Sequence, residues 1–195
     1  MKGFILKWEI PLPFIIFGNS FDTIMKTACG FWLIGIFVLF ISCKGGVKKH
    51  NHYFSLTDTT ELRLPNSTWE EVLTDGVYTV TREGSTEMPY TNEYWDFKGT
   101  GHYHCAACGN LLFSSAHKYD SGTGWPSFWQ PSEPNRLLFR KDFSEREERI
   151  EVRCRRCGGH LGHLFYDGPA PTRQRYCMNS LALKFVGGKG SKPTK

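Results

Sequence analysis

The sequence predicts a mainly β domain that follows an N-terminal export or anchor segment. After residue 76, Gly, Pro and Asn interrupt the chain roughly every eight to twelve residues, as in short strands joined by turns. Short apolar runs recur between these breaks, at 111–113, 137–139, 150–152, 161–166 and 176–185. They do not alternate with helix-length patterns, so the sequence indicates a β-rich fold with a few short helices rather than repeated βαβ units.

An uncharged apolar run fills residues 28–41, after Lys26 and before Cys43. A basic start, an apolar stretch and a small residue at its end are typical of a secretory signal. The run is shorter than the roughly 20 residues that span a membrane. Residues 39–43, LFISC, resemble the lipobox of bacterial lipoproteins, although Phe40 stands where that pattern prefers Leu. We therefore expect a membrane-anchored lipoprotein of the bacterial cell envelope, lipidated at Cys43. The alternatives are a retained anchor, a cleaved signal with an exported soluble product, and a buried core helix.

These patterns divide the chain into successive parts. Met25 followed by Lys26 has the form of a natural start, so the residues before it are interpreted as an upstream extension. The predicted boundaries are 1–24 for the extension, 25–43 for the signal or lipoprotein segment, 44–64 for a polar tether, 65–187 for the folded domain and 188–195 for a loose tail.

At the start of the domain, Ser67 is a helix N-cap candidate and acidic residues follow it in the first turn. This pattern predicts a short helix at 67–75, which Asp75 and Gly76 end. The next residues, 78–81, read YTVT and are β-branched and aromatic, which predicts a strand.

Two identical Cys-x-x-Cys-Gly elements follow, at 105–109 and 154–158. In each of them a tight turn directs two thiolates at one ion, and the Gly relieves backbone crowding. Four sulfurs suit a tetrahedral Zn²⁺ with no open position, so the ion would be structural rather than catalytic. Two disulfides and a redox-active Cys-x-x-Cys are the alternatives. The predicted zinc ligands are Cys105, Cys108, Cys154 and Cys157.

Another cysteine, Cys177, lies in an alternating apolar pattern that predicts a strand up to Phe185. A period of two places Arg175, Cys177 and Asn179 on one face of that strand. A cation beside a thiol favours the thiolate, and an Asn amide can hold a polar substrate atom. The alternative is that Cys177 is a small buried core residue.

Two further motifs carry polar or aromatic groups. His160 and His163 directly follow the second cysteine pair, and they are interpreted as proton donors and orienting groups because four sulfurs already satisfy the zinc. The turn at 120–128, DSGTGWPSF, presents Trp125 and Phe128. Trp125 forms either part of the core or the wall of a small apolar pocket.

Taken in order, CxxCG, SGTGWPSF, CxxCG with HLGHLF, and DGPAPTRQRYCMNSLALKF closely resemble the B-type methionine sulfoxide reductases, which act on the R epimer. The resemblance runs from about Trp69 to Phe185. It implies two antiparallel sheets with a structural zinc, and oxidised proteins or free methionine sulfoxide as substrates. It also implies that Cys177 is the nucleophile. Further roles follow for the remaining motif residues: Trp125 and Phe128 contact the substrate, His160, His163 and Asn179 surround the sulfoxide oxygen, and Arg175 is the cation near the thiolate.

The chain departs from the family at one position. Many members carry a resolving cysteine in the turn before GWPSF, where this chain has Thr123. Four other cysteines are assigned to zinc, Cys43 is assigned to a lipid, and Cys29 would be lost with the signal. We therefore expect an external thiol, supplied by a thioredoxin-like partner, to regenerate Cys177 from its sulfenic acid.

Charge and motif content also bear on rival functions. The 195 residues include 24 basic and 19 acidic ones, for a net charge of +5, and the positive residues are spread along the chain. This charge balance is too weak to predict a nucleic-acid partner. Separately, we expect the protein to be a monomer. A zinc-ribbon module that binds protein or nucleic acid is the main rival interpretation. It leaves Cys177, the His pair and Trp125 without a role.

Overall fold

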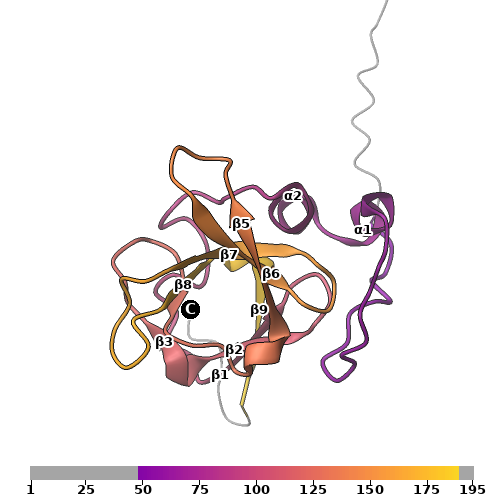
Figure 1. Cartoon of the computed structure of the whole chain (residues 1–195). Helices are drawn as coiled ribbons and strands as arrows, with labels where there is room; N and C mark the ends of the chain where they lie inside the picture. The colour runs from indigo at the N-terminus through magenta and orange to yellow at the C-terminus, as the bar shows by residue number, and fades with distance from the viewer. Residues whose placement is uncertain (1–47, 189–195) are drawn as a thin grey trace, which may run out of the picture. The chain divides into compact units, whose positions relative to one another are not determined.

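Two antiparallel β-sheets form most of the fold (Figure 1), and the structure, a computed structural model, describes residues 48–188. The smaller sheet has the order β2-β1-β9 and consists of Gly101–Cys105 (β1), Leu111–Ser114 (β2) and Leu183–Gly187 (β9). The larger sheet has the order β3-β4-β8-β7-β6-β5. Its strands are Lys118–Tyr119 (β3), Ser127–Phe128 (β4), Leu137–Asp142 (β5), Arg149–Cys154 (β6), His160–Phe165 (β7) and Arg175–Met178 (β8). The prediction of a mainly β fold is confirmed.

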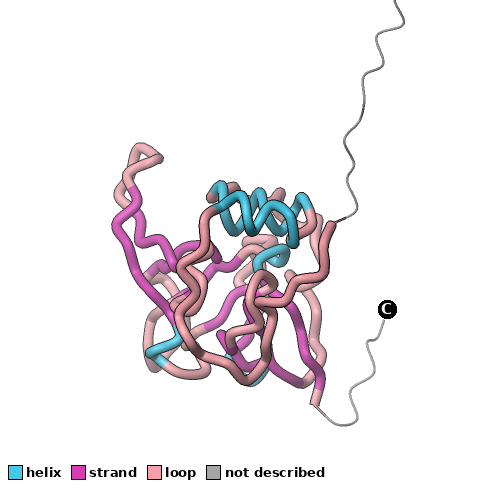
Figure 2. The backbone as a smooth tube through the Cα atoms, turned by 90° about the vertical axis from the view of Figure 1, so that its right-hand side faces the viewer, coloured by secondary structure: helices cyan, strands magenta, loops and turns pink. Residues whose placement is uncertain are grey.

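Helices α1 (Asn66–Val72) and α2 (Asp75–Glu83) precede the sheets. Figure 2 shows both on one side of the strands, with the β5–β6 hairpin projecting away from the body. The helix predicted at 67–75 corresponds to α1, which ends earlier, at Val72.

The strand predicted at 78–81 is wrong, because these residues belong to α2. Val77, Val80 and Thr81 have the three-and-four spacing of one helix face, and α2 packs that side against β7. The hydroxyl of Thr81 donates to the carbonyl of Val77 at 2.7 Å, so this β-branched residue is satisfied inside the helix. Packing therefore overrides the β propensity of the YTVT segment.

The strand predicted up to Phe185 is interrupted. β8 ends at Met178, a 3₁₀ turn occupies Ser180–Ala182, and β9 then begins in the other sheet. Arg175 and Cys177 do share one face of β8, but Asn179 lies just beyond the strand, where it begins the 3₁₀ turn. The alternating apolar pattern continues across this turn, so it conceals the change of sheet.

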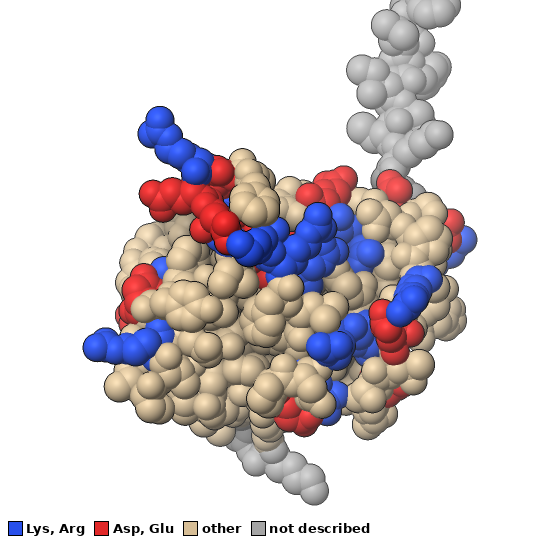
Figure 3. Space-filling view, viewed as in Figure 1, with Lys and Arg blue, Asp and Glu red and all other residues tan. Residues whose placement is uncertain are grey.

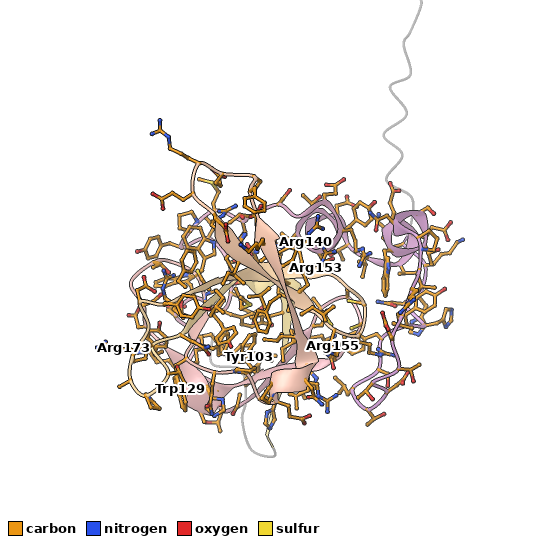
Figure 4. All side chains as sticks on the ribbon, in the orientation of Figure 1. Tyr103, Trp129, Arg140, Arg153, Arg155 and Arg173 are labelled. Atoms are coloured by element: carbon orange, nitrogen blue, oxygen red, sulfur yellow. The ribbon has the colours of Figure 1, made fainter. Side chains whose placement is uncertain are left out.

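Aromatic side chains fill the space between the sheets. Tyr103, labelled in Figure 4, is fully buried. Its ring lies 5.0 Å from that of Phe128 and 5.5 Å from that of Tyr94. Phe128 also stacks on Phe113, with the ring centroids 4.3 Å apart. Burial of such large rings stabilises the fold by roughly 2–3 kcal/mol each. This core fixes the strands that carry the candidate site.

Residues 48–64, which belong to the predicted tether, contain no helix or strand. They lie along the two cysteine turns: Asn51 donates to the carbonyl of Ala107 at 2.9 Å, and the amide of Ser55 donates to that of Cys108 at 3.0 Å. Residues 1–47 and 189–195 lie outside the described part, and with them the predicted extension, signal segment and Cys43. Within residues 48–188, no helix has both the length and the apolar character needed to cross a bilayer.

Candidate active site and four-cysteine cluster

The two Cys-x-x-Cys turns meet in space and bring four sulfur atoms together. Cys105 ends β1 and Cys154 ends β6, so each strand delivers one turn. All four cysteines are buried, and their Sγ atoms lie within 4.8 Å of one another. After the turns, Gly109 and Gly158 adopt φ values of 82° and 68°, which an L side chain would oppose. The structure thus assembles the predicted ligand set.

The spacing of these sulfurs fits a metal ion. The Sγ atoms of Cys105 and Cys157 are 3.7 Å apart, and those of Cys108 and Cys154 are 3.6 Å apart. A regular tetrahedron with metal–sulfur bonds of about 2.3 Å has edges of about 3.8 Å. The buried guanidinium of Arg156 donates to the carbonyl of Cys108, beside the cluster. A cation there suits four thiolates, whose charge exceeds that of a divalent ion.

Cys177 lies in the middle of a row of side chains that crosses the whole six-stranded sheet. In an antiparallel sheet, residues paired across neighbouring strands point to the same face. Cys177 is paired with His163 on β7 and with Ser127 on β4. The full row, from β5 to β3, is Arg140, Glu151, His163, Cys177, Ser127 and Tyr119.

A small cavity of about 110 Å³ opens at Cys177. His163 and Asn179 bring polar groups to it, while Trp125 and Phe165 supply aromatic surface. Its full lining is Thr86, Trp125, Arg149, Gly162, His163, Phe165, Cys177, Met178 and Asn179. An apolar wall, a thiol and a polar group within one small cavity fit a compact substrate that has an apolar and a polar end.

Trp125 and Asn179 are held in the cavity by a single segment. The indole Nε1 of Trp125 donates to the carbonyl of Glu87 at 3.1 Å, and the Oδ1 of Asn179 accepts from the amide of Glu87 at 3.1 Å. The buried carboxylate of Glu87 in turn accepts the amides of Ser180 and Leu181, at 2.6 and 2.9 Å. Burial raises the pKa of Glu87, and these amide bonds oppose that rise. Glu87 therefore joins two cavity residues to the turn that follows β8.

The two histidines differ in their surroundings. The Nε2 of His163 lies 2.8 Å from the Oδ2 of Asp142, and His163 lines the cavity at Cys177. The Nδ1 of His160 lies 2.9 Å from the Oε1 of Glu151, and its buried Nε2 has no partner among the described residues. Burial lowers the pKa of His160 despite Glu151, so its ring is neutral at neutral pH. The geometry places His163, rather than His160, beside the thiol.

The half-buried Cys177 thiol has a pKa above its ordinary value because burial outweighs the stabilisation of the thiolate by Arg175, Thr123 and Ser127. The influence of Arg175 is limited by a bidentate ion pair. Its Nε and Nη2 donate to Asp167 at 2.7 and 2.9 Å, and its guanidinium lies 4.2 Å from the centre of the Phe165 ring. Arg175 acts on the thiol in the expected direction, but the net shift of the thiol pKa is upward.

Hydroxyl groups surround the other side of the thiol. The Oγ1 of Thr123 lies 4.0 Å from the Sγ of Cys177 and 2.8 Å from the Oγ of Ser121. The Oγ of Ser121 is 2.7 Å from that of Ser127, whose hydroxyl donates to the carbonyl of Trp125 at 3.3 Å. The result is a continuous chain of hydroxyls from the sulfur to a backbone carbonyl.

Phe128 does not belong to the cavity, which corrects its assignment to the substrate. Its side chain is fully buried in the aromatic core. In β4, Ser127 points toward Cys177, so its neighbour Phe128 must point to the opposite face of the sheet. Because β4 has only two residues, the sequence carried no periodic signal that could separate them.

Sequence reasoning also missed several functional neighbours. Asp142 on β5 hydrogen-bonds to His163, and Glu151 on β6 hydrogen-bonds to His160. Arg149, also on β6, lines the cavity. Residues 149–153, RIEVR, alternate charged and apolar groups, which was the available signal. Figure 3 shows basic and acidic side chains gathered around the β5–β6 hairpin, with both signs of charge on the same face.

Comparisons with known proteins agree with this geometry. The SelR domain matches residues 73–187, which include all four clustered cysteines and Cys177. A peptide methionine sulfoxide reductase MsrB of Hahella chejuensis is 47% identical over 130 residues, which are 67% of this chain and 94% of the relative. An MsrB of Pseudomonas aeruginosa (strain UCBPP-PA14) is 50% identical over 127 residues, 65% of this chain and 96% of the relative. An MsrB of Methanosarcina barkeri is 51% identical over 117 residues, 60% of this chain and 82% of the relative.

The SelR match covers more than half of the chain, and these relatives align over most of their own length. The protein therefore belongs to the SelR-domain family, together with peptide methionine sulfoxide reductases of the MsrB type.

Proposed function

We propose that this protein reduces methionine-R-sulfoxide, free or in oxidised proteins, to methionine. The observation that carries the proposal is the placement of Cys177 and His163 as register partners, in a cavity that Trp125 also lines. Membership of the SelR-domain family supports the same activity. A zinc-ribbon interaction module is not favoured, because it gives this cavity no role.

In the first step, the sulfur of Cys177 attacks the sulfur of the sulfoxide. The methyl group packs against Trp125, while His163 and Asn179 face the oxygen. Because burial keeps Cys177 protonated, the proton that the oxygen needs originates from the thiol, and His163 relays it. Methionine leaves, and the oxygen remains on Cys177 as a sulfenic acid. One thiol and one sulfoxide thus give one sulfenic acid and one thioether.

In the second step, an external thiol reduces the sulfenic acid. Attack of this thiol on Cys177 forms a mixed disulfide and releases water, and a second thiol then restores Cys177. Thr123, which stands where many members of the resembled family carry a resolving cysteine, contacts Cys177. The described cysteines other than Cys177 are all in the buried cluster. We expect a thioredoxin-like donor to fill this role.

The four clustered cysteines hold one structural zinc ion in this proposal. The tetrahedral spacing of their sulfurs and the all-thiolate donor set support zinc over harder cations such as Mg²⁺ or Ca²⁺. Four protein ligands leave no position on the zinc for a substrate, so the ion would stabilise the fold rather than take part in catalysis. The test is metal analysis of the purified protein, with one zinc per chain as the expected result.

The proposed location is the bacterial cell envelope, through a lipid on Cys43. The lipobox-like sequence at 39–43 supports this location. Mass spectrometry of the mature N-terminus provides the test: a diacylglyceryl-modified Cys43 at the first position is expected. An unmodified Cys43 within a longer peptide would contradict the lipoprotein assignment.

Turnover of separated sulfoxide epimers tests the activity itself. With dithiothreitol as reductant, the wild type should reduce the R epimer of a methionine sulfoxide peptide and leave the S epimer unchanged. Cys177→Ser should lose this activity, because a hydroxyl is a far weaker nucleophile toward sulfur. Wild-type turnover of the S epimer, or turnover of the R epimer by Cys177→Ser, would overturn the proposal.

A further inference from the structure

The turn between β3 and β4 holds a threonine hydroxyl against the Cys177 sulfur, and that turn is fixed in place. The amide of Tyr90 donates to the carbonyl of Gly124 at 2.9 Å, and its phenol donates to the carbonyl of Gly122. The carboxylate of Asp120 accepts the amide of Gly122 at 2.9 Å. These bonds close the turn on both sides of Thr123. The 4.0 Å contact between Thr123 and Cys177 is therefore built into the fold.

The protons of the hydroxyl chain can be counted. Each hydroxyl donates only one proton. When Ser127 donates its proton to the carbonyl of Trp125, it accepts from Ser121. Ser121 has then used its own proton and accepts from Thr123. In this arrangement the Thr123 proton can go either to the oxygen of Ser121 or to the sulfur of Cys177.

This arrangement gives the two states of the sulfur different hydrogen bonds. With Cys177 as a thiol, its S–H can donate to Thr123, and Thr123 donates to Ser121, so that every proton has an acceptor. When the thiol loses its proton, a rotation of the Thr123 hydroxyl redirects one proton onto the sulfur. Ser121 and Ser127 keep the bonds that they donate, and only the bond from Thr123 to Ser121 is given up.

We infer that Thr123 is a catalytic residue that donates a hydrogen bond to the Cys177 thiolate, and that Ser121 and Ser127 hold it ready to do so. The inference rests on the proposed function and deepens it. Hydrogen bonds to charged groups are stronger than those to neutral groups, so the thiolate gains more than the thiol. In this chain the residue at position 123 thus activates the nucleophile, whereas a cysteine there would resolve the oxidised Cys177.

The test is the pH dependence of Cys177 alkylation by iodoacetamide, followed by mass spectrometry of the full chain. Thr123→Val retains the shape of the side chain and removes the hydroxyl. It should lower the alkylation rate at neutral pH about tenfold and move the profile to higher pH, because a lost bond to a thiolate shifts its pKa by about one unit. Thr123→Ser restores a hydroxyl and should recover most of the rate.

Further variants separate the donor from its support. Thr123→Ala should behave like Thr123→Val, which covers the case in which valine disturbs the turn. Ser121→Ala leaves the donor present, so it should move the profile less than Thr123→Val. Thr57→Val, at an exposed position that does not line the cavity, is the matched control and should match the wild type.

An unchanged alkylation profile in Thr123→Val and Thr123→Ala would overturn the inference. So would a serine variant as slow as the valine variant, since the methyl group rather than the hydroxyl would then matter. Alkylation requires no sulfoxide, so these outcomes are independent of the reductase assay. If R-sulfoxide turnover persists while the profile stays unchanged, the inference fails and the proposed function stands.

Discussion

The reactivity of Cys177 depends on opposing effects at single residues. Burial favours the neutral thiol, and a guanidinium and hydroxyls favour the thiolate. The bidentate pair between Arg175 and Asp167 weakens one of the favourable effects, because the carboxylate neutralises the cation. Burial therefore makes the thiol less reactive at neutral pH, and we expect His163 to take its proton when a substrate fills the cavity.

Asp167→Asn tests this balance. The substitution leaves Arg175 without its counter-charge, so the thiolate should become more stable and the pKa of Cys177 should fall. Iodoacetamide alkylation at neutral pH should then rise about two- to threefold, on the order of half a pKa unit. Asp167 is largely exposed, so the fold should tolerate the change. A profile that stays in place, or moves to higher pH, would show that the ion pair does not limit Arg175.

The two histidines offer a second comparison. His163→Asn should lower kcat for R-sulfoxide by about 10²- to 10⁴-fold, the usual effect of removing a general acid. His160→Asn should reduce kcat less, because His160 does not line the cavity at Cys177. Steady-state kinetics of both variants at several pH values provide the measurement. An equal loss in both, or a larger loss in His160→Asn, would contradict the assignment.

The elements that carry these residues were predicted unevenly from the sequence. The apolar runs at 111–113, 137–139 and 150–152 fall in strands, and the run at 161–166 lies in β7 up to Phe165, because burial imposes a visible apolar pattern. The strand proposed at 78–81 is part of a helix, since its β-branched residues pack at helical spacing. Strands β3 and β4 have two residues each, which is too short for any periodic signal.

The close pairing of β7 and β8 depends on one glycine. Gly162 has a φ of 155°, and a Cβ placed there would lie 2.1 Å from the carbonyl oxygen of Cys177. Gly162→Ala should push the two strands apart at the nucleophile and cost about 1–3 kcal/mol of unfolding free energy. The urea concentration at the unfolding midpoint and kcat should therefore both decrease. As a control, a Cβ at the neighbouring Gly159 would come no closer than 3.3 Å to another atom, so Gly159→Ala should cost less.

At the scale of the whole molecule, the cysteine cluster joins the two sheets. Cys105 ends a strand of the smaller sheet and Cys154 ends a strand of the larger one. Removal of the proposed metal would leave four buried thiols and no metal bridge between the two cysteine turns. Prolonged treatment with a strong chelator should lower Tm by more than about 10 °C, as circular dichroism would record. A chelated protein with the wild-type Tm and no bound metal would refute a structural role.

The candidate site could be predicted from the sequence where a motif carried its residues. Short motifs carry Cys177, His163, Trp125 and the four clustered cysteines. The structure brings the first three together at one cavity. It brings the four cysteines together in a separate cluster. The bonds from the histidines to Asp142 and Glu151 could not be predicted, because they depend on β5, β6 and β7 lying side by side in the sheet. The same holds for Glu87, which contacts residues more than 90 positions away in the sequence.

The central claim is that Cys177 takes the oxygen from methionine-R-sulfoxide and has no internal resolving partner. A single-turnover reaction without reductant tests it most directly. With excess R-sulfoxide peptide, each chain should form about one methionine, and dimedone should label Cys177 alone as a sulfenic acid. No methionine in the absence of reductant, or an intramolecular disulfide at Cys177, would contradict the account.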